Sequence, residues 1–93
     1  MSNTVHELKC WERYFDAVAD GRKTFEVRKN DRAFQTGDIL ELIKAEEKPP
    51  YYHITPHGER FGKITIRKRI TYILQGGQFG IEPAYCVLGL GEP

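Results

Sequence analysis

One early helix is the feature that most constrains how this chain can fold. Four apolar residues of the segment CWERYFDAVADG recur at the i, i+3, i+4 and i+7 spacing of an amphipathic helix: Trp11, Tyr14, Phe15 and Val18. Gly21 follows, and glycine adopts at no steric cost the left-handed conformation that ends many helices. We therefore predict a helix over residues 10–20, with its apolar stripe packed against the rest of the domain.

The rest of the sequence shows strand patterns separated by turns and loops. Apolar residues alternate or run together in five segments, at residues 5–9, 24–29, 39–44, 61–74 and 84–90. TGD and the glycine-rich QGGQFGIEP are turn and loop signals, and the prolines of EEKPPYYHITPHG indicate an exposed loop over 46–58. Because no helix separates 39–44 from 61–74, a doubly wound parallel sheet does not fit.

These elements predict a mainly β domain of the α+β class, built as a small mixed or antiparallel barrel with one helix packed beside it. In the segment 61–74, Lys68 interrupts a face of alternating apolar residues, which predicts a bulge or a bend where the barrel curves. A length of 93 residues favours a single domain spanning 1–93. Neither a signal-peptide pattern nor an apolar run long enough to span a membrane is present, so we expect a cytoplasmic protein without membrane contact.

The two cysteines, Cys10 and Cys86, lie far apart and match no metal-binding spacing, so we predict two free thiols in a reducing compartment. A structural metal held by His6, Cys10, His53 and His57 is the alternative, because each pair is separated by three residues. The second pair falls in a loop with proline and glycine, and no further close ligand pair accompanies it. We therefore predict no metal and no cofactor.

The charges are nearly balanced overall but unevenly distributed. The chain has 14 Lys and Arg against 13 Asp and Glu, a formal net charge of +1. Residues 22–32 hold five basic and two acidic side chains, and residues 59–69 hold five basic and one acidic. Such segregation creates a local basic field on a nearly neutral molecule.

The first basic window lies in the segment GRKTFEVRKNDR, which reads as a strand. Its alternation predicts that Phe25 and Val27 point towards the core. Thr24, Glu26 and Arg28 then share the opposite face, which is either a solvated sheet face or a polar site on a rigid element. The Arg fork suits phosphate or carboxylate, and the Glu carboxylate accepts hydrogen bonds from a base amino group or orients the Arg.

The stretch GRKTFEVR matches the GxKxxExR signature of the ASCH domain, a branch of the PUA-like superfamily. The resemblance extends over HELKCWERYFDAVADGRKTFEVRKNDRAFQTGDIL and YILQGGQFGIEPAYCVLGL, and so over nearly the whole chain. The chain is similar to small bacterial and phage members of that family, long left as a domain of unknown function.

The resemblance implies a β-barrel with an RNA-binding cleft beside the first helix. Carried over by position, the motif residues are Gly21, Lys23, Glu26 and Arg28. Some ASCH relatives hydrolyse N4-acetylated cytidine, pairing the motif Lys with a Thr nucleophile at the position that is Glu26 here. This chain has Thr24 two residues earlier on the same predicted face, and that departure favours binding over hydrolysis.

Other residues are candidates for the same site. His6 and Lys9 precede the helix within reach of the cleft, although His6 alternatively is a partly buried strand residue with a local hydrogen bond. Phe79, among glycines, is the best candidate outside the motif for stacking on a base, or else plugs one end of the barrel. Asn30 and Arg32 extend the polar site or stabilise the following turn.

Further aromatic and basic residues carry weaker indications. Trp11 and Tyr14 suit base stacking, but their helical spacing favours core packing. Tyr51 and Tyr52 lie in the proline-rich loop. The RKR run at 67–69 reads as a solvated edge that can contact phosphates if a nucleic-acid strand crosses the cleft.

We therefore expect the cleft to bind RNA, another single-stranded nucleic acid or a nucleotide-like ligand, with Lys23 and Arg28 on phosphate. The alternative is an amidohydrolase of acylated nucleosides or a ribonuclease, in which Lys23 activates water or Thr24 and Glu26 is acid or base. A third hypothesis is a protein-interaction module docked through the charged strand face. The pattern leaves the oligomeric state open.

Overall fold

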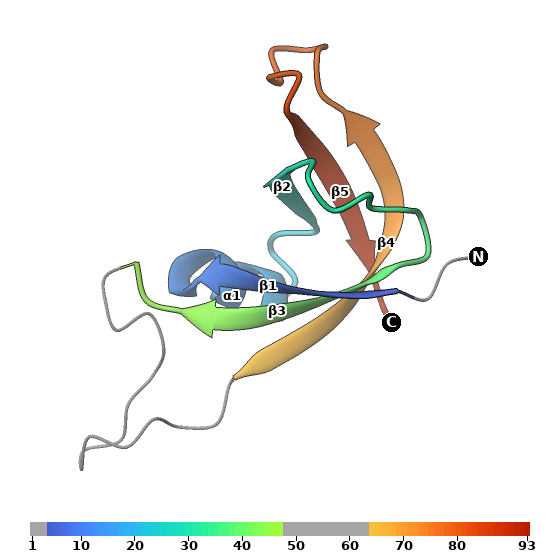
Figure 1. Ribbon diagram of the computed structural model, residues 1–93. Coiled ribbons are helices and arrows are strands. Elements are labelled where there is room, and N and C mark those ends of the chain that lie inside the picture. The colour runs from blue at the N-terminus through green and yellow to red at the C-terminus, as the bar shows by residue number, and fades with distance from the viewer. Residues whose placement is uncertain (1–3, 48–63) are drawn as a thin grey trace.

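The computed structural model describes residues 4–47 and 64–93. Its elements, in chain order, are β1 (Val5–Trp11), α1 (Glu12–Ala19), β2 (Phe25–Lys29), β3 (Ile39–Ala45), β4 (Thr65–Gln75) and β5 (Tyr85–Gly91) (Figure 1). The mainly β architecture with one early helix is confirmed. The predicted loop over 46–58 and the start of the segment 61–74 fall mostly outside the described residues. No helix in the described ranges has the length and apolar character needed to cross a membrane.

The strands form one mixed sheet in the order β1-β3-β4-β5-β2. Strand β1 pairs with β3 in parallel, and the other neighbours are antiparallel. The prediction of a barrel was wrong, because β1 and β2 remain the two edges of an open sheet in the described part of the chain. The sheet is strongly curled, so that the strands cross one another in Figure 1.

Side chains connect the two edge strands where a barrel would have a main-chain ladder. The Arg28 Nη2 atom donates to the carbonyl oxygen of Lys9 at 2.7 Å. Earlier in β1, the carbonyl oxygen of Glu7 accepts a hydrogen bond at 3.1 Å from the Nη1 atom of Arg32, which lies in the β2–β3 connection. The guanidinium groups thus satisfy β1 carbonyls across the gap between the two edges of the open sheet.

Helix α1 is shorter than the predicted helix over 10–20, because Cys10 and Trp11 belong to β1. Both residues continue the parallel ladder, opposite Lys44 and Ala45 of β3, so pairing overrides the helical spacing. The end of the helix is as predicted, with Gly21 in the left-handed region at φ +86°. The chain then turns directly into β2.

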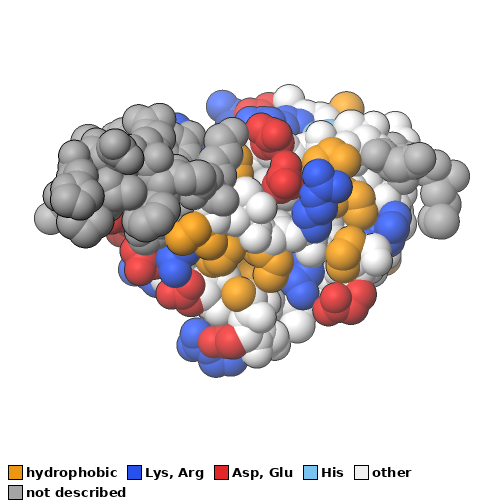
Figure 2. All heavy atoms as spheres, turned by 90° about the horizontal axis from the view of Figure 1, so that it is seen from below, with side chains coloured by type: hydrophobic (Ala, Val, Ile, Leu, Met, Phe, Trp, Pro, Cys, Tyr) orange, Lys and Arg blue, Asp and Glu red, His pale blue; other side chains and the backbone are white. Residues whose placement is uncertain are grey.

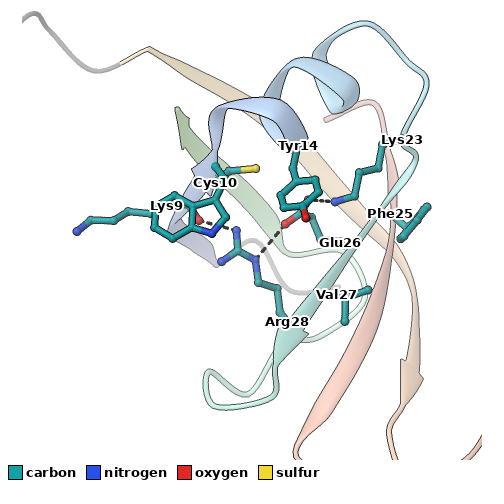
Figure 3. Close-up of a pocket in the computed structure, with 9 residues that line it drawn as sticks. Lys9, Cys10, Tyr14, Lys23, Phe25, Glu26, Val27 and Arg28 are labelled. Atoms are coloured by element: carbon teal, nitrogen blue, oxygen red, sulfur yellow. Dashed lines mark hydrogen bonds and ion pairs between the residues drawn. The ribbon is translucent and has the colours of Figure 1, made fainter. Parts of the chain in front are cut away.

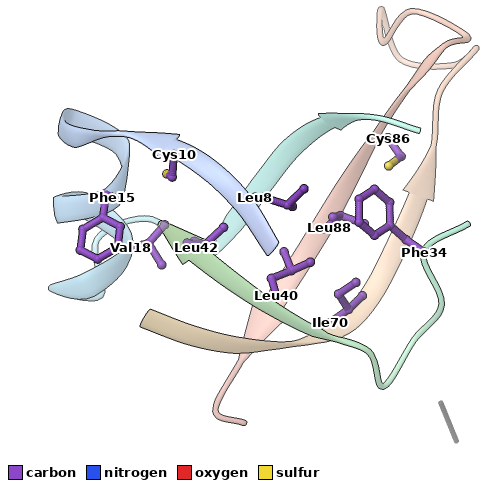
Figure 4. Close-up of a cluster of buried hydrophobic side chains, with 10 residues drawn as sticks. All are labelled: Leu8, Cys10, Phe15, Val18, Phe34, Leu40, Leu42, Ile70, Cys86 and Leu88. Carbon is purple, nitrogen blue, oxygen red and sulfur yellow. The ribbon is translucent and has the colours of Figure 1, made fainter. Parts of the chain in front are cut away.

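The core lies between the inner face of the curled sheet and α1 (Figure 4). Helix α1 contributes Phe15 and Val18, and the inner face of the sheet contributes apolar side chains from all its strands except β2. These sheet residues are Leu8, Cys10, Leu40, Leu42, Ile70, Cys86 and Leu88, and Phe34 packs with them from the β2–β3 connection. Because α1 contributes only two side chains to the core, one flank of the helix is open to solvent.

The irregularity predicted at Lys68 occurs slightly later in β4. The register with β5 shifts between Ile70 and Tyr72, so that Thr71 is the extra residue of the bulge. Ile70 is fully buried, whereas the Tyr72 side chain is 66% exposed, because an inserted residue turns the following side chains to the other face. Lys68 itself remains in regular pairing opposite Leu40.

Candidate functional site

A pocket lies where edge strand β2 faces the end of β1 and the start of α1 (Figure 3). Its volume is about 720 Å³, within the range of small-molecule sites. The lining residues are Lys9, Cys10, Trp11, Tyr14, Lys23, Phe25, Glu26, Val27 and Arg28. The pocket exists because the sheet does not close at this point.

Strand β2 is oriented opposite to the prediction. Phe25 and Val27 are 42% and 52% exposed, whereas Glu26 is only 4% exposed. The predicted alternation is present, but Glu26 and Arg28 occupy the inner side, facing β1 and α1. Burial of a carboxylate is tolerated here because two cationic groups neutralise it.

Glu26 is held between the other two charged residues of the motif. Its Oε1 atom contacts the Lys23 ammonium, and its Oε2 atom accepts a hydrogen bond from Arg28 Nε at 3.1 Å (Figure 3). The side chains of Lys23 and Arg28 are 19% and 23% exposed, so both cations are partly open to the pocket. The three residues therefore form one charge network with a net charge of +1.

The main chain of β2 adds polar groups to the pocket. The Leu90 N–H donates to the Thr24 carbonyl at 2.9 Å, and the Asn30 N–H donates to the Ala84 carbonyl at 2.8 Å. Even-numbered residues of β2 therefore hydrogen-bond to β5, and odd-numbered residues direct their N–H and C=O groups away from it. Phe25 and Val27 consequently present main-chain donors and acceptors at the edge that lines the pocket.

Aromatic rings form the pocket walls. Trp11 and Tyr14 are 37% and 41% exposed, so the prediction that both pack in the core was wrong. Helix α1 turns only Phe15 and Val18 inward, and the other half of the predicted stripe faces the pocket. The Lys23 Nζ atom lies 5.3 Å from the Tyr14 ring centroid and 5.2 Å from that of Phe25. Its charge is thus held between two aromatic rings.

The Cys10 thiol lies at the pocket but is only 3% exposed. Burial raises its pKa from 9.0 to about 11, the Glu26 carboxylate contributes to that rise, and Arg28 and Lys23 oppose it. The thiol is therefore protonated at neutral pH and is a poor nucleophile.

We expect Cys10 to resist alkylation in the folded protein. In a Cys86→Ala variant, which leaves Cys10 as the one cysteine of the chain, iodoacetamide modification at pH 8 should be slow and should accelerate only as the pH approaches about 11. Intact-mass spectrometry measures the rate, and the same variant in urea supplies the unprotected reference. Equal rates in the folded and unfolded protein would contradict the protection.

Residues 5–90 match the family model of the domain of unknown function DUF3850. The chain belongs to the DUF3850 family. All nine lining residues of the pocket lie within the matched region of this DUF3850 domain.

A phage protein shares part of this sequence. It is described as an uncharacterized 12.9 kDa protein in the GpA 3′ region of Escherichia phage P2, and it is 45% identical over 42 residues. The match covers 45% of this chain and 38% of the phage protein, so the chain spans well under half the length of that relative.

Some predicted site residues of the DUF3850 domain lie outside the pocket. His6 is 8% exposed, and its Nε2 atom lies 2.7 Å from Asp38 Oδ2, which is the local hydrogen bond considered as the alternative. Thr24 and Arg32 are exposed and are not pocket-lining residues. Phe79 is 85% exposed in the β4–β5 loop, also away from the pocket lining. Lys9, Lys23, Glu26 and Arg28 are the predicted residues that the fold brings together.

The remaining polar candidates make local contacts. Asn30 Nδ2 donates to Gln75 Oε1 at 2.8 Å, which ties the end of β2 to β4. In the basic run, Arg67 and Lys68 pair with Glu41 and Glu92, and the Arg69 Nη1 atom donates to the Gly37 carbonyl. Figure 2 shows one face of the molecule, on which side chains of both charges lie close together among hydrophobic ones. Arg67 and Lys68 are therefore each paired with an acid, Arg69 is hydrogen-bonded to a carbonyl and keeps its charge, and the run is not part of the pocket lining.

The alternative of a structural metal site has no support in the described residues, where no group of three or more potential ligands occurs. His53 and His57 lie outside the described residues.

The sequence patterns did not predict Phe25, Val27 and Cys10 as pocket residues, and they placed Trp11 and Tyr14 mainly in the core. The position of these apolar residues directly beside the charged motif was the available signal.

Proposed function

We propose that this protein is an ASCH-like member of the PUA-like superfamily, and that its pocket binds an unpaired nucleotide of single-stranded RNA or a related nucleotide-like ligand. The observation that carries the proposal is the meeting of Lys23, Glu26 and Arg28 in one aromatic-walled pocket. Gly21 contributes by ending α1, so that Lys23 begins the approach to β2.

The charge of the pocket supports an anionic ligand. Lys9, Lys23 and Arg28 oppose the single carboxylate of Glu26, a net charge of +2. Arg28 uses Nε for Glu26 and Nη2 for the Lys9 carbonyl, and within the described residues no hydrogen bond engages its Nη1 atom. A guanidinium held in place with one nitrogen available is suited to a phosphate oxygen.

The pocket walls support a base in preference to a bare anion. Trp11 and Tyr14 offer exposed rings for stacking, and every base has a face that stacks on an aromatic ring. The main-chain groups of Phe25 and Val27 offer donors and acceptors to the edge of an unpaired base. Such a base is accessible only in single-stranded nucleic acid or in a free nucleotide.

The test is the affinity for a labelled ten-nucleotide RNA of mixed sequence, measured by fluorescence anisotropy at low salt. We expect Lys23→Ala and Arg28→Lys to weaken binding by about tenfold or more, because each loses a charge-assisted hydrogen bond. Lys23→Ala removes a cation and should also reduce the slope of log affinity against log salt by about 0.7, whereas Arg28→Lys keeps its charge and should leave the slope nearly unchanged.

Arg22→Ala is the matched control. Arg22 belongs to the same charged segment but is 70% exposed, pairs with Asp20 and lies outside the pocket lining. Circular dichroism verifies that each variant is folded. If Lys23→Ala and Arg28→Lys bind RNA as tightly as the wild type, the assignment of the pocket is wrong.

Hydrolysis of an acylated nucleoside is a second candidate, favoured by the direct contact between Lys23 and Glu26 in the pocket. Thr24 is not a lining residue, so Lys23 would act on water, with Glu26 as the acid or base. Incubation with N4-acetylcytidine and with labelled RNA distinguishes the two functions. Product formed by the wild type but not by Glu26→Gln favours the enzyme, and no product from the wild type favours binding.

A further inference from the structure

Two exposed aromatic residues flank a glycine on the outer face of the sheet. Phe25 of β2 and Tyr72 of β4 are both paired in register with Gly89 of the intervening strand β5. Residues directly opposite one another in a sheet point to the same face, so both rings stand on one side of Gly89. The bulge at Thr71 is what turns Tyr72 to this outer face.

The spacing of this aromatic pair suits a flat ring. Strands lie about 4.8 Å apart, so the Cα atoms of Phe25 and Tyr72 are roughly 10 Å apart across Gly89. A ring stacked on both sides at carbon contact distances of 3.5–4.0 Å needs about 7–8 Å between the flanking rings. Phe25 and Tyr72 are 42% and 66% exposed, so both residues are open to solvent on this face.

A polar group lies at the base of the aromatic pair. A Cβ atom added at Gly89 would be 3.3 Å from the Thr71 Oγ1 atom, so this hydroxyl of β4 lies beside the outer face of the glycine. A hydroxyl both donates and accepts, and can therefore bond to the edge of any base. A ring inserted above Gly89 thus meets aromatic faces on its sides and a hydrogen-bonding group at its edge.

We propose that the aromatic pair Phe25 and Tyr72 stacks on a second base of the same RNA strand, next to the nucleotide held in the pocket. This inference rests on the proposed function. The second base belongs to the same RNA strand because Phe25 connects the pocket with the aromatic pair. Phe25 lines the pocket, where Lys23 lies 5.2 Å from its ring centroid, and it forms one side of the pair.

Basic residues on the same face favour a nucleic-acid strand over an apolar protein as the binding partner. Lys29 lies opposite Tyr85, and Arg69 lies opposite Gly91, so both belong to the face that carries the aromatic pair. These side chains lie on either side of the pair, towards opposite ends of β5. Phosphates of a strand stacked above Gly89 would run between them.

The test compares wild type, Tyr72→Ala and Gly89→Val for binding to the same ten-nucleotide RNA. We expect Tyr72→Ala to weaken binding about five- to a hundredfold, the effect of losing one stacked base. The slope of log affinity against log salt should stay unchanged, because no phosphate contact is lost. Gly89→Val keeps both rings but places a side chain between them, and should weaken binding similarly.

Tyr85→Ala is the matched control, since Tyr85 is an exposed tyrosine on the same face of β5, about 13 Å from Gly89. Wild-type affinity in both Tyr72→Ala and Gly89→Val would overturn the inference while leaving the pocket assignment intact. Self-association that Tyr72→Ala abolishes, with RNA binding unchanged, would assign this face to a second copy of the chain. Absence of RNA binding by the wild type would overturn both proposals.

Discussion

Replacing Glu26 with glutamine is expected to lower the free energy of unfolding by about 3 kcal/mol. Glu26 is 4% exposed and neutralises both Lys23 and Arg28. Glutamine keeps the size of the side chain but removes its charge, and its amide NH2 group then faces a cation. The two cations are partly exposed, so the effect belongs at the lower end of the range for a broken buried pair.

Urea unfolding followed by circular dichroism measures this loss. Glu92→Gln is the matched control, because Glu92 also pairs with a lysine, Lys68 at 3.3 Å, but its side chain is 88% exposed. An exposed pair is worth less than about 1 kcal/mol, so the control should unfold nearly as the wild type does. Equal stability of Glu26→Gln and Glu92→Gln would show that the buried network does not contribute to the fold.

Gly76→Ala is expected to destabilise the protein by about 3 kcal/mol or more, through overlap in the β4–β5 hairpin. A Cβ atom at this position would lie 2.0 Å from the Glu82 carbonyl oxygen and 2.3 Å from the Tyr85 carbonyl oxygen. Both are backbone atoms and cannot turn aside as a flexible side chain does. The hairpin therefore has to open for the methyl group to fit.

The neighbouring Gly77 separates this overlap from backbone strain. Gly77 has φ +89° but no atom within 4 Å of an added Cβ, so Gly77→Ala costs only the left-handed conformation, about 1–2 kcal/mol. In urea unfolding, the free energy of unfolding should therefore be highest for the wild type, lower for Gly77→Ala and lowest for Gly76→Ala. A reversed order would mean that the hairpin accommodates the methyl group and that conformational strain dominates.

Local patterns predicted most elements of this fold correctly. The end of the helix at Gly21, the turn before β3 and the glycine-rich β4–β5 connection each depend on neighbours within a few residues. The helix start was misplaced because Cys10 and Trp11 satisfy both a helical stripe and a strand, and only pairing with Lys44 and Ala45 decides between the two.

Closure of the sheet depended on contacts that no local pattern encodes. A barrel and an open curled sheet use the same strands in the same order. The difference is whether β2 pairs with β1 through its main chain, or whether Arg28 of β2 and Arg32 of the β2–β3 connection contact β1 through their side chains. Those contacts join residues 19 and 25 positions apart. The pocket is a direct consequence of that difference.

The sequence by itself determined that Phe25 and Val27 lie on one face of a strand and Glu26 and Arg28 on the other, because side chains alternate along any strand. It also placed Lys23, Glu26 and Arg28 within reach of a common site. Only the tertiary structure decided which face is inside. A charged side chain is excluded from an interior unless it is neutralised, and Glu26 meets that condition only when Lys23 and Arg28 fold back onto it against β1 and α1.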